Sequence, residues 1–152
     1  MSNLSPAFAF PLSPEPLVLA AARSLVARLD AGEVITRPTL NAVLTEQFGG
    51  SDAEARWSVR DAHAALELAQ VLWLQNSPQL RLSSPPETAR DVFDRLGAQL
   101  PSQTVRSEEQ IELQQFATPP HLAWLAARAC AFGPSEVALE PSAGTGMLAV
   151  WA

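Results

Sequence analysis

The sequence predicts a mainly α-helical protein, a bundle of about five to six helices that ends in a strand, a glycine loop and the start of another helix. Three observations predict this fold class. Apolar residues recur at helical spacing, prolines and glycines bound those segments, and one short apolar run near the C-terminus precedes two glycines. With 47% hydrophobic and 17% charged residues in 152, the composition is that of a folded chain.

Changes in composition divide the chain into four expected parts. They are an irregular N-terminal arm (1–13), an N-terminal helical bundle (14–76), a connection rich in proline and serine (77–86), and helices leading into a strand and the glycine loop at 140–146 (87–152).

Capping residues predict the first two helices. Ser13 is the expected N-cap of the first, with Pro14 at its first position, where a missing N–H costs nothing. Gly32 predicts its end. Pro38 predicts the start of the second helix, and the glycine pair at 49–50 predicts its end.

Two capping boxes precede the third helix, Ser51 with Glu54 and Ser58 with Asp61. This helix therefore either starts twice or bends near Trp57. A helix that is apolar on two faces is usually central. Its two apolar stripes are Ala62, Leu66, Ala69 and Trp73 on one side, and Leu68, Val71 and Leu72 on the other.

After the connection, apolar spacing predicts a helix from Ala89 to Leu100. Ser107 and Gln110 form a further capping box, which predicts another helix start.

The last full helix is expected to have Thr118 as its cap, to begin at Pro119 and to end at the Gly-Pro pair of 133–134. Only residues 136–139 then have the pattern of a strand. The helix is expected to bury Leu122, Leu125, Ala126 and Ala129.

Composition also argues against several classes of function. The net charge is −6, and the ten basic residues, all arginines, are scattered, so direct nucleic-acid binding is not expected. No apolar run approaches the roughly 20 residues that cross a bilayer, and the start lacks a signal-peptide pattern, which favours a cytoplasmic location. The single cysteine, Cys130, and the isolated His63 and His121 do not predict a metal site or a nucleophile.

The chemistry-bearing stretch is Leu139 to Leu148, "LEPSAGTGML". A strand that ends in such a sequence presents backbone N–H groups at the start of the next helix, where the partial positive charge suits a carboxylate. Gly144 and Gly146 permit positive φ and let a ligand approach the backbone closely.

Two segments, "QQFATPPHLAWLAARA" from Gln114 and "VALEPSAGTGMLAVWA" from Val137, together resemble the N-terminal part of class I S-adenosylmethionine-dependent methyltransferases of the adenine-N6 DNA type. The chain is similar in particular to the methyltransferase-like region of large mobile-element proteins related to strawberry notch helicases. The resemblance extends from about Trp57 to the end, and it implies that the C-terminal strand, loop and helix are the truncated start of a Rossmann-like fold.

The resemblance implies S-adenosylmethionine as the cofactor, with Thr118 at its amino-acid end and Glu140 beneath the loop, orienting backbone N–H groups or the ligand's ammonium. The implied binding residues are Gln115, Phe116, Thr118, Pro119, Glu140, Pro141, Ser142, Ala143, Gly144 and Gly146.

Two parts of a complete adenine methyltransferase have no match here: the acidic residue after the second strand and the [DN]-P-P-[FYW] tetrapeptide. The proline pairs at 85–86 and 119–120 lack the required Asp or Asn and the aromatic residue. We therefore expect no catalytic residue in this chain, no enzymatic activity of the chain alone, and no tight binding of the cofactor by it alone.

Two hypotheses follow. The first is a non-catalytic protein-interaction module of mobile-element origin, of an anti-defence type that blocks a bacterial nucleic-acid-processing complex. Its protein partner would be a second copy bound through residues 137–152, or a bacterial or phage complex. The alternative is a fragment or subunit of an adenine-N6 methyltransferase that contributes part of the cofactor site.

Overall fold

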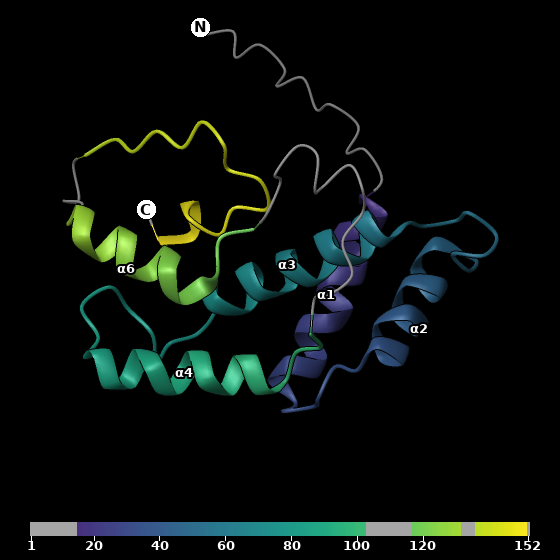
Figure 1. Ribbon diagram of the computed structural model, residues 1–152, viewed down its shortest axis with the longest axis horizontal. Helices are drawn as coiled ribbons and strands as arrows, with labels where there is room; N and C mark the ends of the chain where they lie inside the picture. The colour runs from purple at the N-terminus through teal and green to yellow at the C-terminus, as the bar shows by residue number, and fades with distance from the viewer. Residues whose placement is uncertain (1–14, 103–116, 132–135, 152) are drawn as a thin grey trace, which may run out of the picture.

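The computed structural model describes residues 15–102, 117–131 and 136–151 (Figure 1). These residues form five α-helices and a short 3₁₀ helix, without a strand among them, so the predicted mainly helical bundle is confirmed. No described helix is both long enough and apolar enough to span a membrane. The elements are α1 (Leu17–Asp30), α2 (Arg37–Phe48), α3 (Val59–Gln75), α4 (Pro86–Ala98), α6 (Pro120–Cys130) and η1 (Ala149–Trp151).

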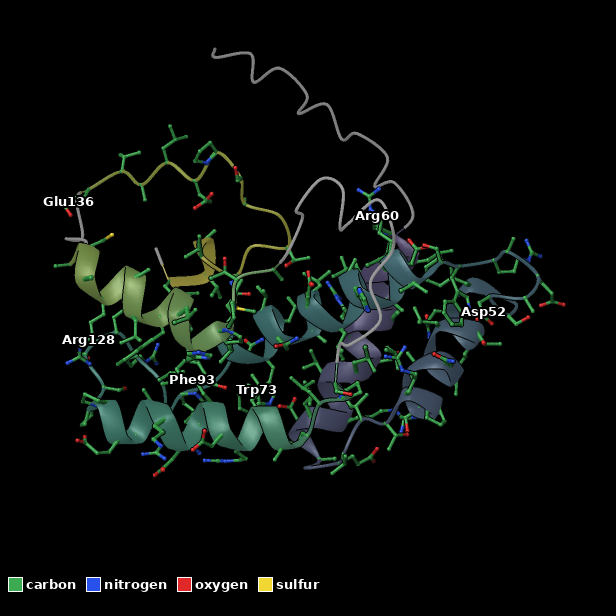
Figure 2. The ribbon with its side chains drawn as sticks, in the orientation of Figure 1. Asp52, Arg60, Trp73, Phe93, Arg128 and Glu136 are labelled. Atoms are coloured by element: carbon green, nitrogen blue, oxygen red, sulfur yellow. The ribbon has the colours of Figure 1, made fainter. Side chains whose placement is uncertain are left out.

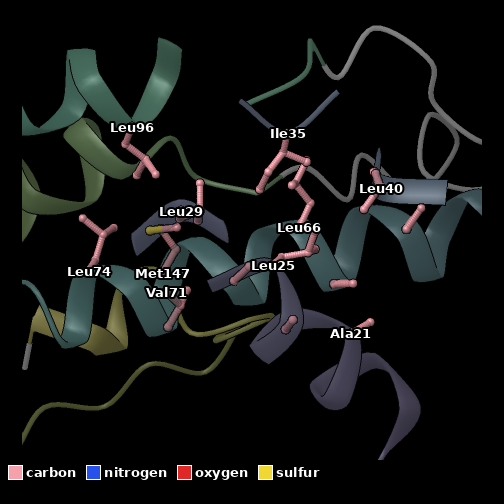
Figure 3. Packing of buried hydrophobic residues seen from close by; sticks show 14 of the residues in the cluster. Ala21, Leu25, Leu29, Ile35, Leu40, Leu66, Val71, Leu74, Leu96 and Met147 are labelled. Carbon is pink, nitrogen blue, oxygen red and sulfur yellow. The ribbon is translucent and has the colours of Figure 1, made fainter. Parts of the chain in front are cut away.

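The core forms where α1 packs against α3. Leu25 of α1 and Leu66 of α3 are fully buried and lie close together in Figure 3, with Leu96 of α4 and Met147 of the C-terminal segment in the same cluster. Because α3 also contacts α2 and η1, the prediction that it is the central helix is confirmed.

The ends of α1 and α2 follow local chemistry. α1 begins at Leu17 with Pro16 as N-cap, later than the predicted start at Pro14, and the predicted cap at Ser13 lies outside the described residues. In α2, the Thr36 side chain accepts a hydrogen bond from the Thr39 N–H (3.2 Å), and Gly49 ends the helix in the left-handed conformation (φ 69°), as predicted. Gly32, at φ 75°, likewise follows the end of α1.

Only the second capping box begins α3. Ser58 Oγ accepts from the Asp61 N–H at 3.2 Å, and Asp61 Oδ2 accepts from the Ser58 N–H at 2.8 Å. The first box closes a turn instead, because Glu54 Oε2 accepts from both the N–H (2.7 Å) and the hydroxyl (3.0 Å) of Ser51 without a helix following. Those two bonds stabilise the carboxylate and lower the pKa of Glu54.

A buried glutamine joins the ends of α1 and α4. The Gln99 side-chain amide donates to the carbonyl oxygens of Leu29 (3.1 Å) and Glu33 (3.3 Å), while the backbone carbonyl of Gln99 accepts from the Ile35 N–H at 2.7 Å. These bonds satisfy backbone groups that burial would otherwise leave without partners, and they hold α4 against the core.

α6 buries a different face from the one predicted. Leu122 and Leu125 are 49% and 52% exposed, whereas Ala123, Trp124 and Ala127 are buried. Its N-cap is Pro119 without a side-chain cap bond, so Thr118 is not the cap. The helix ends at Cys130 with Ala131 as its left-handed C-cap, before the predicted end at 133–134.

Trp124 determines which face of α6 is buried. Its indole N–H donates to the Arg81 carbonyl oxygen (3.1 Å), and its ring meets the edge of Phe93 with centroids 6.3 Å apart. The Arg128 guanidinium lies over the same ring, 5.0 Å from its centroid. One large aromatic side chain with a polar partner outweighs two leucines of the other face.

The predicted strand at residues 136–139 is absent. Val137 is 96% exposed and Leu139 89% exposed, and a single strand without a hydrogen-bonded neighbour is not stable in water. The chain then turns back to the bundle, where Met147 is only 4% exposed and η1 contacts both α3 and α6. The helix predicted after the glycine loop is therefore a short 3₁₀ turn.

The face that α6 buries predicts unequal losses of stability for two neighbouring substitutions to alanine. We expect Trp124→Ala to lower the free energy of unfolding by about 3–5 kcal/mol, because it removes a buried ring. Leu125→Ala should lower it by less than about 1 kcal/mol, since that side chain is half exposed. Urea denaturation of both variants measures the difference, and equal losses would contradict the observed register.

Candidate functional site

A cavity of about 770 Å³ lies between α3 and the C-terminal segment. Three stretches of chain line it: one face of α3, residues 117–118 before α6, and residues 141–145 and 147–148 of the glycine loop and its continuation. Its volume falls within the roughly 300–1,000 Å³ of pockets that hold small-molecule ligands.

The cavity brings together residues from both predicted motifs. Thr118 lines it from one side, and the glycine loop lines it from another through Pro141, Ser142, Ala143 and Gly144. These two stretches belong to the two separate motifs in which the sequence predicts binding residues.

The other predicted residues lie around the cavity or outside the description. Glu140 sits at the base of the loop, where its Oε1 accepts from the Ser142 N–H at 2.8 Å. Pro119 is the N-cap of α6 rather than a lining residue. Gln115 and Phe116 lie outside the described residues.

The two loop glycines have the backbone conformation that their residue type allows. Gly144 has φ 53° and Gly146 φ 94°, as the sequence pattern predicted. The Gly146 N–H donates to the Ala143 carbonyl at 2.7 Å and closes the turn. A Cβ added at Gly146 would lie 3.9 Å from Val71 Cγ1 of α3, which places this glycine against the helix.

Contacts with α3 position the loop. Met147, directly after Gly146, is buried in the core, and Thr145 Oγ1 donates to Glu67 Oε2 at 3.5 Å. A buried thioether side chain and a polar link to the helix therefore hold the loop on the bundle.

The lining from α3 was not identified by the sequence motifs. It consists of Arg60, His63, Ala64 and Glu67, which share one face at spacings of three, four and seven residues. Arg60 lies near the N-terminal end of the helix in Figure 2. The only sequence feature that could have predicted this lining is the polar stripe on one face of α3, which includes Arg60, His63 and Glu67. Such a stripe is typical of any partly exposed helix, so it does not by itself predict a binding site.

The chemical character of the lining suits a small polar ligand with an apolar part. Hydroxyl groups come from Thr118, Ser142 and Thr145, and apolar surface comes from alanines, Met147 and Leu148. Across the described ranges, no group of three or more His, Cys, Asp or Glu side chains is placed to hold a metal ion. The arrangement therefore offers a binding site for a small polar ligand.

No known protein family, curated protein or solved structure matches the chain.

The conformation of the loop predicts opposite effects for the same substitution at two glycines. Gly146→Ala should destabilise the protein by about 1–2 kcal/mol, because an L-residue is strained at positive φ. Gly97→Ala in α4, where nothing lies within 4 Å of the added Cβ, should stabilise it by about 0.4–1 kcal/mol. Thermal unfolding compares the two, and stabilisation by Gly146→Ala would contradict the loop geometry.

Proposed function

We propose that the glycine-loop cavity binds S-adenosylmethionine, and that the chain supplies this part of the cofactor site to a protein of the adenine-N6 DNA methyltransferase type. One observation carries the proposal: Thr118 and residues 141–144, from two separate motifs of that family's pattern, line the same cavity.

The chemistry of the ligand fits what lines the cavity. S-adenosylmethionine has a charged amino-acid end and an adenosine end, so its site must offer both polar and apolar surface. Thr118 and Ser142 supply hydroxyl groups, and Gly144 lets a ligand approach the backbone, whereas Gly146 packs against α3 and does not line the cavity. Met147 and Leu148 supply apolar contact.

The proposed contribution of the chain is cofactor binding, not methyl transfer. Transfer to an adenine amino group requires residues that grip the extruded base, and the tetrapeptide that does so in this family does not occur in the sequence. Those residues would come from another polypeptide segment. The single apolar stretch at 136–139 would then pair with strands of the same completing segment.

Calorimetric titration with S-adenosylmethionine tests the proposal. We expect micromolar binding by the wild-type chain and its loss in Gly144→Asp, because the added side chain occupies the cavity lining where the ligand would approach the backbone. Gly32→Asp is the matched control: it also has positive φ, nothing lies within 4 Å of its added Cβ, and it does not line the cavity.

Two outcomes would contradict the proposal. If titration of the wild-type chain gives no binding heat, the proposed cofactor binding is wrong. Equal weakening by both glycine variants would show that binding depends on fold stability rather than on the loop.

A second candidate function is association with another protein, and the exposure of Val137 and Leu139 favours it. Two large apolar side chains at alternate positions, almost fully in water, are typical of a segment that pairs with an extended segment of a partner. A second copy of this chain is the partner proposed here, because the same segment is present in each copy.

Light scattering over a range of concentrations tests this association. The wild-type mass should rise toward that of a dimer, while Val137→Asp/Leu139→Asp should remain monomeric. Val34→Asp is the control, since Val34 is also an exposed valine (60%) but lies between α1 and α2. A monomeric wild-type chain at every concentration would rule out self-association.

A further inference from the structure

We propose that Arg60 and Glu67 of α3 select the ligand, by binding the carboxylate and the ammonium of its amino-acid end. This inference rests on the proposed cofactor function and extends it to the helical bundle. It gives α3, which neither motif includes, a direct role in specificity.

The first step is the position of the two residues. Both line the cavity, on the face of α3 that looks toward the glycine loop. Seven residues separate them, which is about 10 Å along a helix axis, with His63 and Ala64 between them. Their long side chains can converge on a group that lies over the intervening turn.

The second step is the pairing of charges. Among the residues that line the cavity, Arg60 is the only arginine and Glu67 the only carboxylate, and the lining from the other two stretches carries no ionisable side chain. A cavity with one cation and one anion matches a zwitterion better than a nucleotide phosphate, which would need several cations.

The third step is the link between Glu67 and the glycine loop. Glu67 Oε2 accepts from Thr145 Oγ1 at 3.5 Å, which is at the long limit of a hydrogen bond. The carboxylate therefore lies beside the loop that would hold the ligand, where a ligand ammonium would meet it. The charge nearest the start of α3 is accordingly the cation, and the charge nearest Thr145 is the anion.

The local structure at the start of α3 supports Arg60 as the anion-binding group. The first turn of the helix is already capped, because Ser58 and Asp61 satisfy each other's backbone N–H groups. A ligand carboxylate there would depend on the guanidinium rather than on the end of the helix.

The test compares two ligands that differ only where α3 is proposed to act. S-adenosylmethionine carries the amino-acid end, whereas 5′-methylthioadenosine keeps the adenosine and sulfur without it. Both are titrated by calorimetry into the wild-type chain, Arg60→Gln, Glu67→Gln and Arg60→Lys. Arg23→Gln on α1 and Glu46→Gln on α2 are matched controls, since both are exposed and neither lines the cavity.

We expect Arg60→Gln and Glu67→Gln each to weaken S-adenosylmethionine binding by about tenfold or more, as for a lost charge-assisted hydrogen bond. Binding of 5′-methylthioadenosine should change less than about twofold by the same reasoning. Arg60→Lys should retain most of the affinity because it keeps the cation, and the two controls should leave both ligands unaffected.

Other outcomes separate the two proposals. If the wild-type chain binds S-adenosylmethionine but Arg60→Gln and Glu67→Gln bind it equally well, the role of α3 is overturned and the cofactor function stands. Equal weakening of S-adenosylmethionine and 5′-methylthioadenosine binding by these variants would also overturn the role of α3, because it would show a general effect on the cavity and not recognition of the amino-acid end. Absence of wild-type binding would overturn both proposals.

Discussion

Small side chains let α1 and α3 approach closely, and the remainder of the structure is arranged around that contact. Ala21 and Ala22 of α1 and Ala65 and Ala69 of α3 are essentially inaccessible to water. Leucines from both helices fill the space beside them, and α4 closes the cluster through Leu96 and the hydrogen bonds of Gln99. Because α1 covers one side of α3 only, another side of this central helix remains for the C-terminal segment and the cavity.

The glycine loop is held in an unusual way for its sequence. A loop of this kind ordinarily follows a strand, and the sheet positions it. Here the preceding residues are exposed and without strand structure, and α3 supports the loop instead through buried Met147 and the contact between Thr145 and Glu67. The helix that forms the core is thus also one wall of the cavity, so core packing and ligand geometry depend on the same element. Under the proposed function, the bundle is part of the cofactor site rather than a separate attachment to it.

The helical elements could be predicted because their signals are local. The capping box of Ser58 and Asp61, the left-handed Gly49 and the positive φ of Gly144 each depend on a few neighbouring residues. The failures involve choices between local alternatives. Ser51 and Glu54 satisfy the same pairing rule as Ser58 and Asp61, yet form a turn. The apolar residues of α6 allow two faces, and the contacts of Trp124 with α4 and with the Arg81 carbonyl select one.

The sequence by itself determined the helical character, several helix ends and the residue types of the glycine loop, since propensity, capping and backbone freedom are properties of short stretches. It also placed Thr118 in one motif and residues 140–146 in the other. Only the tertiary structure decided that these motifs line one cavity and that Arg60, His63 and Glu67 face them. The tertiary structure also leaves the side chains of Val137 and Leu139 exposed to solvent. Those outcomes depend on contacts between distant segments, and strand formation in particular requires a neighbour that local sequence does not provide.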